Sequence, residues 1–294
     1  MIKFQSLLLL ALIAIVSDLN AQTTSSLVVV SLTKINTPEQ ELSPFVSADD
    51  STLYLTREDG AAKMNHTAPN KLYRARRTAD GSWGKAEEMP GFEHVSVFGA
   101  VTMDSAGEMF ISYQPAGNKN GDLDIGQVVG NTIVNIKDLN SDYWDAHPSI
   151  SGNGKEMYIT SNRLGPKDPP KIFVSHRLGD KSWTPPAALD SRFNYGKFSG
   201  FPFISADAKL LIFGSAHDEH GIQLYASQRG NGGAWSEPVL LPKPINIPCN
   251  NTFSFLTRDG HEFYFASDRP GGMGKMDIYE VKLPNGVGDL FGTH

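Results

Sequence analysis

Residues 259–267, DGHEFYFAS, contain a two-residue Asp-Gly turn followed by a run of aromatic and β-forming residues that ends in serine. This pattern predicts two strands joined by a tight hairpin. The chain repeats it five times, and successive copies start 57, 47, 54 and 52 residues apart. The five turns are Asp49-Asp50, Ala106-Gly107, Asn153-Gly154, Asp207-Ala208 and Asp259-Gly260. A period of about 50 residues with several strands in each copy is typical of β-propeller blades.

Each turn leads into a second strand and then, after a variable loop, into a third. The second strands are expected at residues 52–56, 108–113, 156–161, 210–215 and 262–267, and the third strands at 71–73, 124–126, 171–173, 223–225 and 277–279. Three copies continue through a hairpin to a tryptophan, Trp83, Trp183 or Trp235, which precedes a fourth, outer strand. Because the tryptophans recur at one position of the repeat, we interpret them as packing residues.

The fifth copy lacks an outer strand, because the chain turns at Pro284-Asn285-Gly286 soon after its third strand. Residues 27–35 (LVVVSLTKI), followed by Asn36, match residues 239–246 (VLLPKPIN) at the end of the fourth copy. An N-terminal strand that completes the last blade leaves no unpaired edge in the ring. We therefore expect an all-β, five-bladed β-propeller closed by this strand, with a six-bladed ring as the alternative. The expected blades span residues 37–92, 93–140, 141–190, 191–246, and 247–284 together with 27–35.

The first 21 residues have the features of a signal peptide. Lys3 gives a basic start, residues 7–16 are apolar, and Leu19-Asn20-Ala21 is a suitable cleavage site before Gln22. The apolar run is too short to span a bilayer. We expect an exported chain, periplasmic or secreted, with one propeller domain over residues 22–284, a C-terminal tail over 285–294 and no transmembrane segment after cleavage.

Composition excludes several classes of function. The net charge is -6, and no basic stripe with interleaved aromatic residues is present, so nucleic acid is not an expected partner. The single cysteine, Cys249, cannot form an internal disulfide and is interpreted as a packed residue. His217-Asp218-Glu219-His220 resembles a metal-binding segment, but it lies in a predicted loop, where the two histidines need not face the same way. We expect no metal and no cofactor.

The repeat resembles a known family at two kinds of position. Ser-Asn-Arg (161–163) and Ser-Asp-Arg (267–269) follow second strands, and residues 267–279, SDRPGGMGKMDIY, are the best match. These motifs resemble the WD-repeat-like, TolB-type β-propeller family of bacterial envelope proteins. The resemblance covers residues 27–284 and implies a propeller that serves as a binding or scaffolding module. TolB-type rings usually have six blades, whereas five copies are present here. In a purely structural reading, the arginine of each triplet bonds blade-edge carbonyls or a neighbouring acid.

Propellers usually bind ligands at a mouth of the central channel, which the first strands line. Alignment of the copies places Glu41, Phe98, Asp145, Ser199 and Asn251 at one inward position, and Ser43, Ala100, His147, Phe201 and Phe253 two residues later. Tyr143, Trp144, Asp145 and His147 bring two aromatic rings, a carboxylate and an imidazole together at one such place. We therefore predict a binding site at Tyr143, Trp144, Asp145, His147, Glu41 and Asn251. The alternative reading is that the aromatics cap the blade and His147 bonds locally.

Two functions remain open at this stage. The first is an exported, monomeric, non-enzymatic protein of the bacterial cell envelope that recognises a protein, peptidoglycan or glycan partner at the channel mouth. The second is a propeller glycoside hydrolase, whose chemistry needs two carboxylates flanking the scissile bond. Glu41 and Asp145 occupy equivalent inward positions and are the candidate catalytic pair for that reaction.

Overall fold

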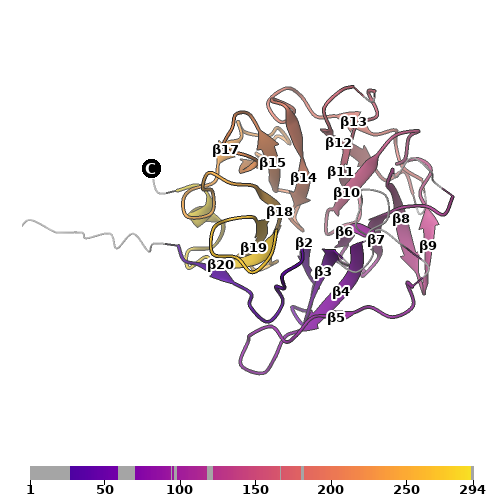
Figure 1. Ribbon diagram of the computed structural model, residues 1–294. Helices are drawn as coiled ribbons and strands as arrows, with labels where there is room; N and C mark the ends of the chain where they lie inside the picture. Colours follow the sequence, from indigo (N-terminus) through magenta and orange to yellow (C-terminus); the bar gives the residue numbers. More distant parts are fainter. Residues whose placement is uncertain are drawn as a thin grey trace, which may run out of the picture.

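The computed structural model describes residues 27–58, 70–93, 95, 98–117, 122–165, 167–179 and 182–292. Over this part of the chain the protein is all-β, with five four-stranded antiparallel sheets arranged around a central axis (Figure 1). The predicted five-bladed propeller is therefore confirmed. The signal peptide expected over residues 1–21 lies outside the described residues. In the described part, no helix has the length and apolar character needed to cross a membrane.

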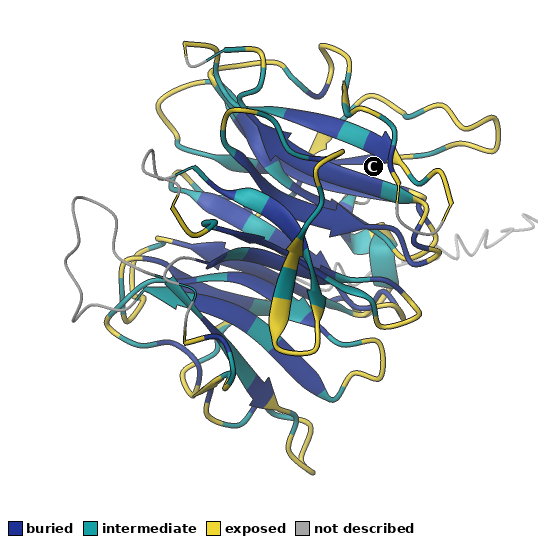
Figure 2. Cartoon of the chain, turned by 90° about the vertical axis from the view of Figure 1, so that its right-hand side faces the viewer, coloured by how far each residue is buried: buried dark blue, intermediate teal, exposed yellow. Residues whose placement is uncertain are grey.

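The blades follow one another along the chain. Blade 1 contains β2 (Glu41–Val46), β3 (Thr52–Glu58), β4 (Asn70–Arg76) and β5 (Glu87–Glu88); blade 2 contains β6 (Phe98–Met103), β7 (Met109–Tyr113), β8 (Asp124–Val129) and β9 (Thr132–Asn135); blade 3 contains β10 (Asp145–Ile150), β11 (Glu156–Ser161), β12 (Lys171–His176) and β13 (Ala187–Ala188); blade 4 contains β14 (Phe198–Ile204), β15 (Leu210–Ala216), β16 (Gln223–Gln228) and β17 (Val239–Leu240); blade 5 contains β18 (Asn251–Leu256), β19 (Glu262–Ser267), β20 (Asp277–Lys282) and β1 (Val29–Ser31). Figure 2 shows the buried strands in the body of the molecule and the exposed residues gathered in the loops.

The N-terminal strand closes the ring, as predicted. β1 pairs antiparallel with β20, so the last blade is built from both ends of the chain. Asn36 follows β1, accepts a hydrogen bond from the Ile278 backbone N–H at 2.8 Å and donates one to the Ile278 carbonyl at 2.9 Å. Asn246 bonds the backbone of Leu224 in blade 4 in the same way, at 2.9 and 2.8 Å. This shared contact is the physical reason for the sequence match. Because β1 completes the fifth blade, the six-bladed alternative is excluded.

The turn residues have the role expected from their chemistry. The Oδ1 atoms of Asp49, Asn153, Asp207 and Asp259 each accept the backbone N–H two residues further on, at 3.0–3.2 Å. Such bonds stabilise the turn between the first and second strands. These side chains therefore form the hairpins.

The tryptophans pack between neighbouring blades. Trp83 and Trp183 are each only 4% exposed, and the indole N–H of Trp83 donates to the Tyr264 hydroxyl of blade 5 at 3.1 Å. An arginine lies over each indole and pairs with a glutamate of the preceding blade; the three clamps are Arg77–Glu262, Arg177–Glu108 and Arg229–Glu156, at 2.6–2.7 Å. Each clamp joins two blades by an ion pair, while its arginine stacks on the indole of its own blade. The interpretation of the tryptophans as packing residues is confirmed.

The C-terminal stretch differs from the expected tail. Residues Gly286–Leu290 form a 3-10 helix, η1, and Leu290 is completely buried in the same core cluster as Leu283 and Leu210. The physical reason is that Leu290 is an apolar side chain that gains free energy on leaving water. η1 therefore belongs to the packed structure of the ring.

Candidate functional site

The inner strands share a local irregularity that shapes the centre of the ring. The register of strands β2, β10, β14 and β18 against their neighbours shifts at a β-bulge. At that point Ser43, His147, Phe201 and Phe253 have φ between 48° and 57°, which is unusual for residues other than glycine. Together with Ala100 of blade 2, these residues line the centre of the channel. The predicted alignment of these five positions around the axis is therefore confirmed.

Aromatic rings fill this centre. The ring centroids of His147, Phe201 and Phe253 lie 4.2–4.9 Å from one another. The free space left beside them is about 30 Å³, which is roughly the volume that one water molecule occupies in the liquid. We call these three residues the plug. Burial lowers the pKa of His147 to about 3, so its imidazole is neutral at physiological pH.

The two inward carboxylates are both engaged in structural contacts. Glu41 Oε1 accepts from Arg57 Nε at 2.7 Å, and Asp145 Oδ1 accepts from Arg163 at 2.5 Å. Both carboxylate side chains are completely buried. Each also accepts a backbone and a hydroxyl hydrogen bond from the residue four positions earlier in the chain. Asp145 Oδ2 accepts both from Ser141, whereas Glu41 accepts the Thr37 N–H at Oε2 and the Thr37 hydroxyl at Oε1. Burial raises the pKa of Glu41, against the opposing effects of its hydrogen bonds and of the neighbouring arginine.

Asn251 occupies the same position in blade 5 and has the same role. Its Oδ1 accepts from Arg269 at 3.0 Å and from the Ser267 hydroxyl at 2.9 Å. The three arginines of this set also donate to loop carbonyls at 2.6–2.7 Å, namely Arg57 to Ile35, Arg163 to Leu139 and Arg269 to Ile245. Because one contact set recurs in three blades, we assign it to the architecture. The structural reading of the Ser-Asn-Arg and Ser-Asp-Arg triplets is confirmed.

Tyr143 and Trp144 remain accessible at the mouth where the inner strands begin. Tyr143 is 37% exposed, and Trp144 is half-buried with its ring edge-to-face on His147 at 5.0 Å. A depression of about 510 Å³ lies beside Tyr143, between blades 2 and 3. Its lining includes Asp124, Lys137 and Tyr143. Tyr143, Trp144, Asp145 and His147 thus lie at one mouth of the ring, where the first two are partly exposed to solvent and the last two are buried.

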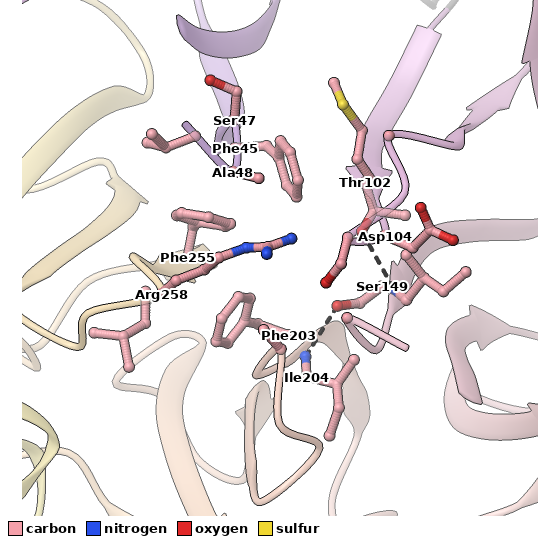
Figure 3. A pocket seen from close by; sticks show the side chains of 18 of the residues that line it. Phe45, Ser47, Ala48, Thr102, Asp104, Ser149, Phe203, Ile204, Phe255 and Arg258 are labelled. Carbon is pink, nitrogen blue, oxygen red and sulfur yellow. Dashed lines mark hydrogen bonds between the residues drawn. The ribbon is translucent and has the colours of Figure 1, made fainter. Parts of the chain in front are cut away.

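A second cavity opens at the opposite mouth, which sequence reasoning did not identify. It has a volume of about 320 Å³ and lies where the inner strands end, at the hairpin turns. We call it the funnel. Figure 3 shows Arg258 extending across it, with Phe45, Phe203 and Phe255 around the arginine and Thr102 and Ser149 on the far side. The available signal was Arg258 itself, an arginine inside a turn that is otherwise built from small residues.

The histidine loop after β15 and the cysteine show no reactive arrangement. The His217 ring packs between Tyr195 and Tyr225, with centroids 4.6 and 5.2 Å away, while His220 lies on the exposed loop. Among the residues that the structure describes, no group of three or more His, Cys, Asp or Glu could hold a metal ion. Burial raises the pKa of Cys249, which disfavours the reactive thiolate.

Comparison with known proteins supports the fold. No family model and no curated protein matches this chain. Among solved structures, a putative TolB from Agrobacterium tumefaciens is 13% identical with a TM-score of 0.52, over 86% of this chain and 89% of that one. A glycoside hydrolase is 10% identical with a TM-score of 0.56, over 86% and 90%.

A thermostable family-43 glycoside hydrolase is 12% identical with a TM-score of 0.51, over 86% of this chain and 93% of that one. The chain spans only 55% of the length of a further structure, TolB from Acinetobacter baumannii, at a TM-score of 0.45. Among these structures, the ones with a TM-score above 0.5 are thus a putative TolB and two glycoside hydrolases. Their likeness establishes the propeller fold, and the function has to be inferred from the residues of the site.

Proposed function

We propose that this chain is an exported, non-enzymatic binding or scaffold protein of the bacterial cell envelope. It acts as a monomer and recognises a protein, peptidoglycan or glycan partner at the mouth where the inner strands begin. The observation that carries the proposal is the state of Glu41 and Asp145, both completely buried and paired with arginine. A carboxylate in this state stabilises the ring and has no free oxygen for a substrate.

The partner surface is centred on Tyr143 and Trp144. Partly exposed aromatic residues supply contact area at a low cost in conformational entropy and are frequent at binding hot spots. The depression beside Tyr143 offers charged and amide groups for orientation. The His147 ring, which is part of the plug, packs against the Trp144 ring. Asp145 accepts a hydrogen bond from the Ser141 backbone N–H and so fixes the start of β10. We therefore reduce the predicted six-residue site to these two contact residues and the groups that position them.

Glycoside hydrolysis is the second candidate, and one observation favours it. Burial raises the pKa of Glu41, and a raised carboxyl pKa is a feature of general acids in glycosidases. The same chemistry needs a sugar ring between two accessible carboxyl groups. The plug leaves about 30 Å³ at the centre of the channel, which is far too small for a sugar. Binding is therefore the better supported function.

A photo-crosslinking experiment tests the proposal. A crosslinking amino acid replaces Tyr143 in one variant and Tyr195, which is 66% exposed on blade 4, in a control variant. Both are expressed with the export signal in a Gram-negative host and irradiated in intact cells. We expect a discrete crosslinked product, protein or peptidoglycan, from position 143 that is absent from position 195. Identical products from both positions, or none from 143, would contradict the proposed surface.

A further inference from the structure

One position of the repeat breaks its own pattern at the funnel. The residue that directly precedes the two turn residues of each hairpin is small in blades 1 to 4 and is an arginine in blade 5. In chain order these residues are Ala48, Ser105, Gly152, Ala206 and Arg258. All five line the funnel. Small residues keep this mouth open, so the long cationic side chain in blade 5 is not a requirement of the fold.

Arg258 also differs from the arginines that build the ring. Arg57, Arg163 and Arg229 are each tied to a buried or half-buried acid by short hydrogen bonds. Arg258 is exposed and makes no hydrogen bond or ion pair with any described residue. Of the described residues that line the funnel, it is the only basic one. An uncompensated guanidinium over a cavity is a ready partner for a planar anion such as a carboxylate.

The remainder of the funnel complements that charge with apolar surface and hydroxyl groups. Phe255 packs against Phe45 and Phe203 at centroid distances of 4.9 and 5.3 Å, which forms a continuous aromatic floor. The hydroxyl oxygens of Thr102 and Ser149 accept backbone N–H groups at 3.2 and 2.9 Å. These contacts use the oxygens as acceptors, so each O–H proton stays available for an incoming anion.

Two carboxylates also line the funnel, and one oxygen of each is engaged in its own turn. Asp49 Oδ1 accepts from the hydroxyls of Ser47 and Ser51 at 2.5 and 2.9 Å. Asp104 Oδ1 accepts two backbone N–H groups at 2.9 Å within its own hairpin. Neither forms a hydrogen bond or ion pair with Arg258. The guanidinium therefore remains the group that a negatively charged ligand meets.

We propose that the funnel is a binding site for an organic carboxylate carried on an apolar body. The carboxylate pairs with Arg258 and accepts from the Thr102 and Ser149 hydroxyls, while the apolar body lies on the phenylalanine floor. A volume of about 320 Å³ lies at the lower end of small-ligand pockets and suits a body the size of one amino acid side chain. The site is at the opposite end of the channel from the proposed partner surface, so it adds a second function to the ring.

The test is calorimetric titration of the full mature chain with 3-phenylpropionate and with 3-phenylpropionamide, its neutral counterpart. The acid should bind about tenfold more tightly than the amide, the size expected for one charge-assisted hydrogen bond. Arg258→Met should abolish this preference, and Arg258→Lys should keep part of it. Lys155→Met, which removes one exposed positive charge from a turn on the same face, should bind the acid as the wild type does.

The source of the carboxylate is tested with acetyl-Gly-Phe, compared as free acid and as amide. Tighter binding of this free acid than of 3-phenylpropionate assigns the site to a chain terminus, and the reverse order assigns it to a free small acid. The proposal is overturned if the wild type binds neither acid, if acids and amides bind equally, or if Arg258→Met binds the acid unchanged. Circular dichroism of each variant confirms that the ring is intact. None of these readouts depends on the proposed partner surface.

Discussion

Replacing His147 by phenylalanine tests whether the centre of the ring is as dry as its packing indicates. The plug positions of blades 4 and 5 already carry Phe201 and Phe253 at φ of 54° and 48°, close to the 53° of His147. A phenylalanine therefore suits this backbone conformation. It also removes His147 Nδ1, a buried atom that has no hydrogen-bond partner among the described residues. The expected effect lies in how stability depends on pH.

The magnitude follows from the lowered pKa. His147 titrates near 6.5 in the unfolded chain, and its pKa falls to about 3 in the folded protein because burial disfavours the imidazolium. The neutral His147 makes its full contribution to the free energy of unfolding above pH 6.5. This contribution is lost as the pH falls toward 3, because the unfolded chain takes up the proton first. Between pH 7 and pH 4.5 this linkage lowers the free energy of unfolding by about 2–3 kcal/mol. His147→Phe removes that contribution and leaves the other titrating groups in place.

The assay is urea unfolding followed by tryptophan fluorescence at both pH values. Between pH 7 and pH 4.5, the free energy of unfolding of the wild type should fall by about 2–3 kcal/mol more than that of His147→Phe. His220→Gln, in which a histidine of the exposed loop is replaced, should behave as the wild type does. Equal losses in wild type and His147→Phe would refute the closed plug, because they would show that the imidazole is protonated in the folded ring.

Three further outcomes are expected. Deleting residues 22–36 removes β1 and exposes the edge of β20, so the shortened chain should aggregate or melt well below the full chain; unchanged melting would contradict ring closure. Glu156→Gln breaks the clamp to Arg229 and should cost about 1–3 kcal/mol in chemical unfolding, whereas an unchanged midpoint would show that the clamp is not stabilising. N-terminal sequencing after expression in a Gram-negative host should find Gln22 first, and a cytoplasmic chain that retains Met1 would be at odds with export.

Much of the fold follows from local chemistry that a sequence displays directly. Turn residues such as Asp259, with β-forming runs on either side, specify a hairpin wherever they occur. Their regular spacing then gives the number of blades. Asn36 indicated that the N-terminal strand closes the ring. An asparagine also follows the outer strand in the fourth copy, and it too forms hydrogen bonds with the backbone of the third strand.

The role of the site residues depends on contacts that spacing cannot supply. Glu41 and Asp145 begin the inner strands β2 and β10, but the arginines that pair with them lie on the next strand or in the turn after it, 16 and 18 residues away. Their pairing depends on the register of two strands. The plug depends in the same way on the bulge that turns His147 toward the axis. Arg258 went unnoticed because a charged turn residue is normally solvated, and only the ring brings the five turns around one cavity.

The most direct test of the central claim is whether the wild-type protein releases reducing sugar from glycans. The mature chain is incubated with arabinan, xylan, pectin and peptidoglycan, and new reducing ends are measured against a protein-free blank. Because Glu41 and Asp145 are buried in ion pairs beside a filled channel, we predict no release above the blank. Release that disappears in folded Glu41→Gln and Asp145→Asn variants would contradict the binding function and establish a hydrolase.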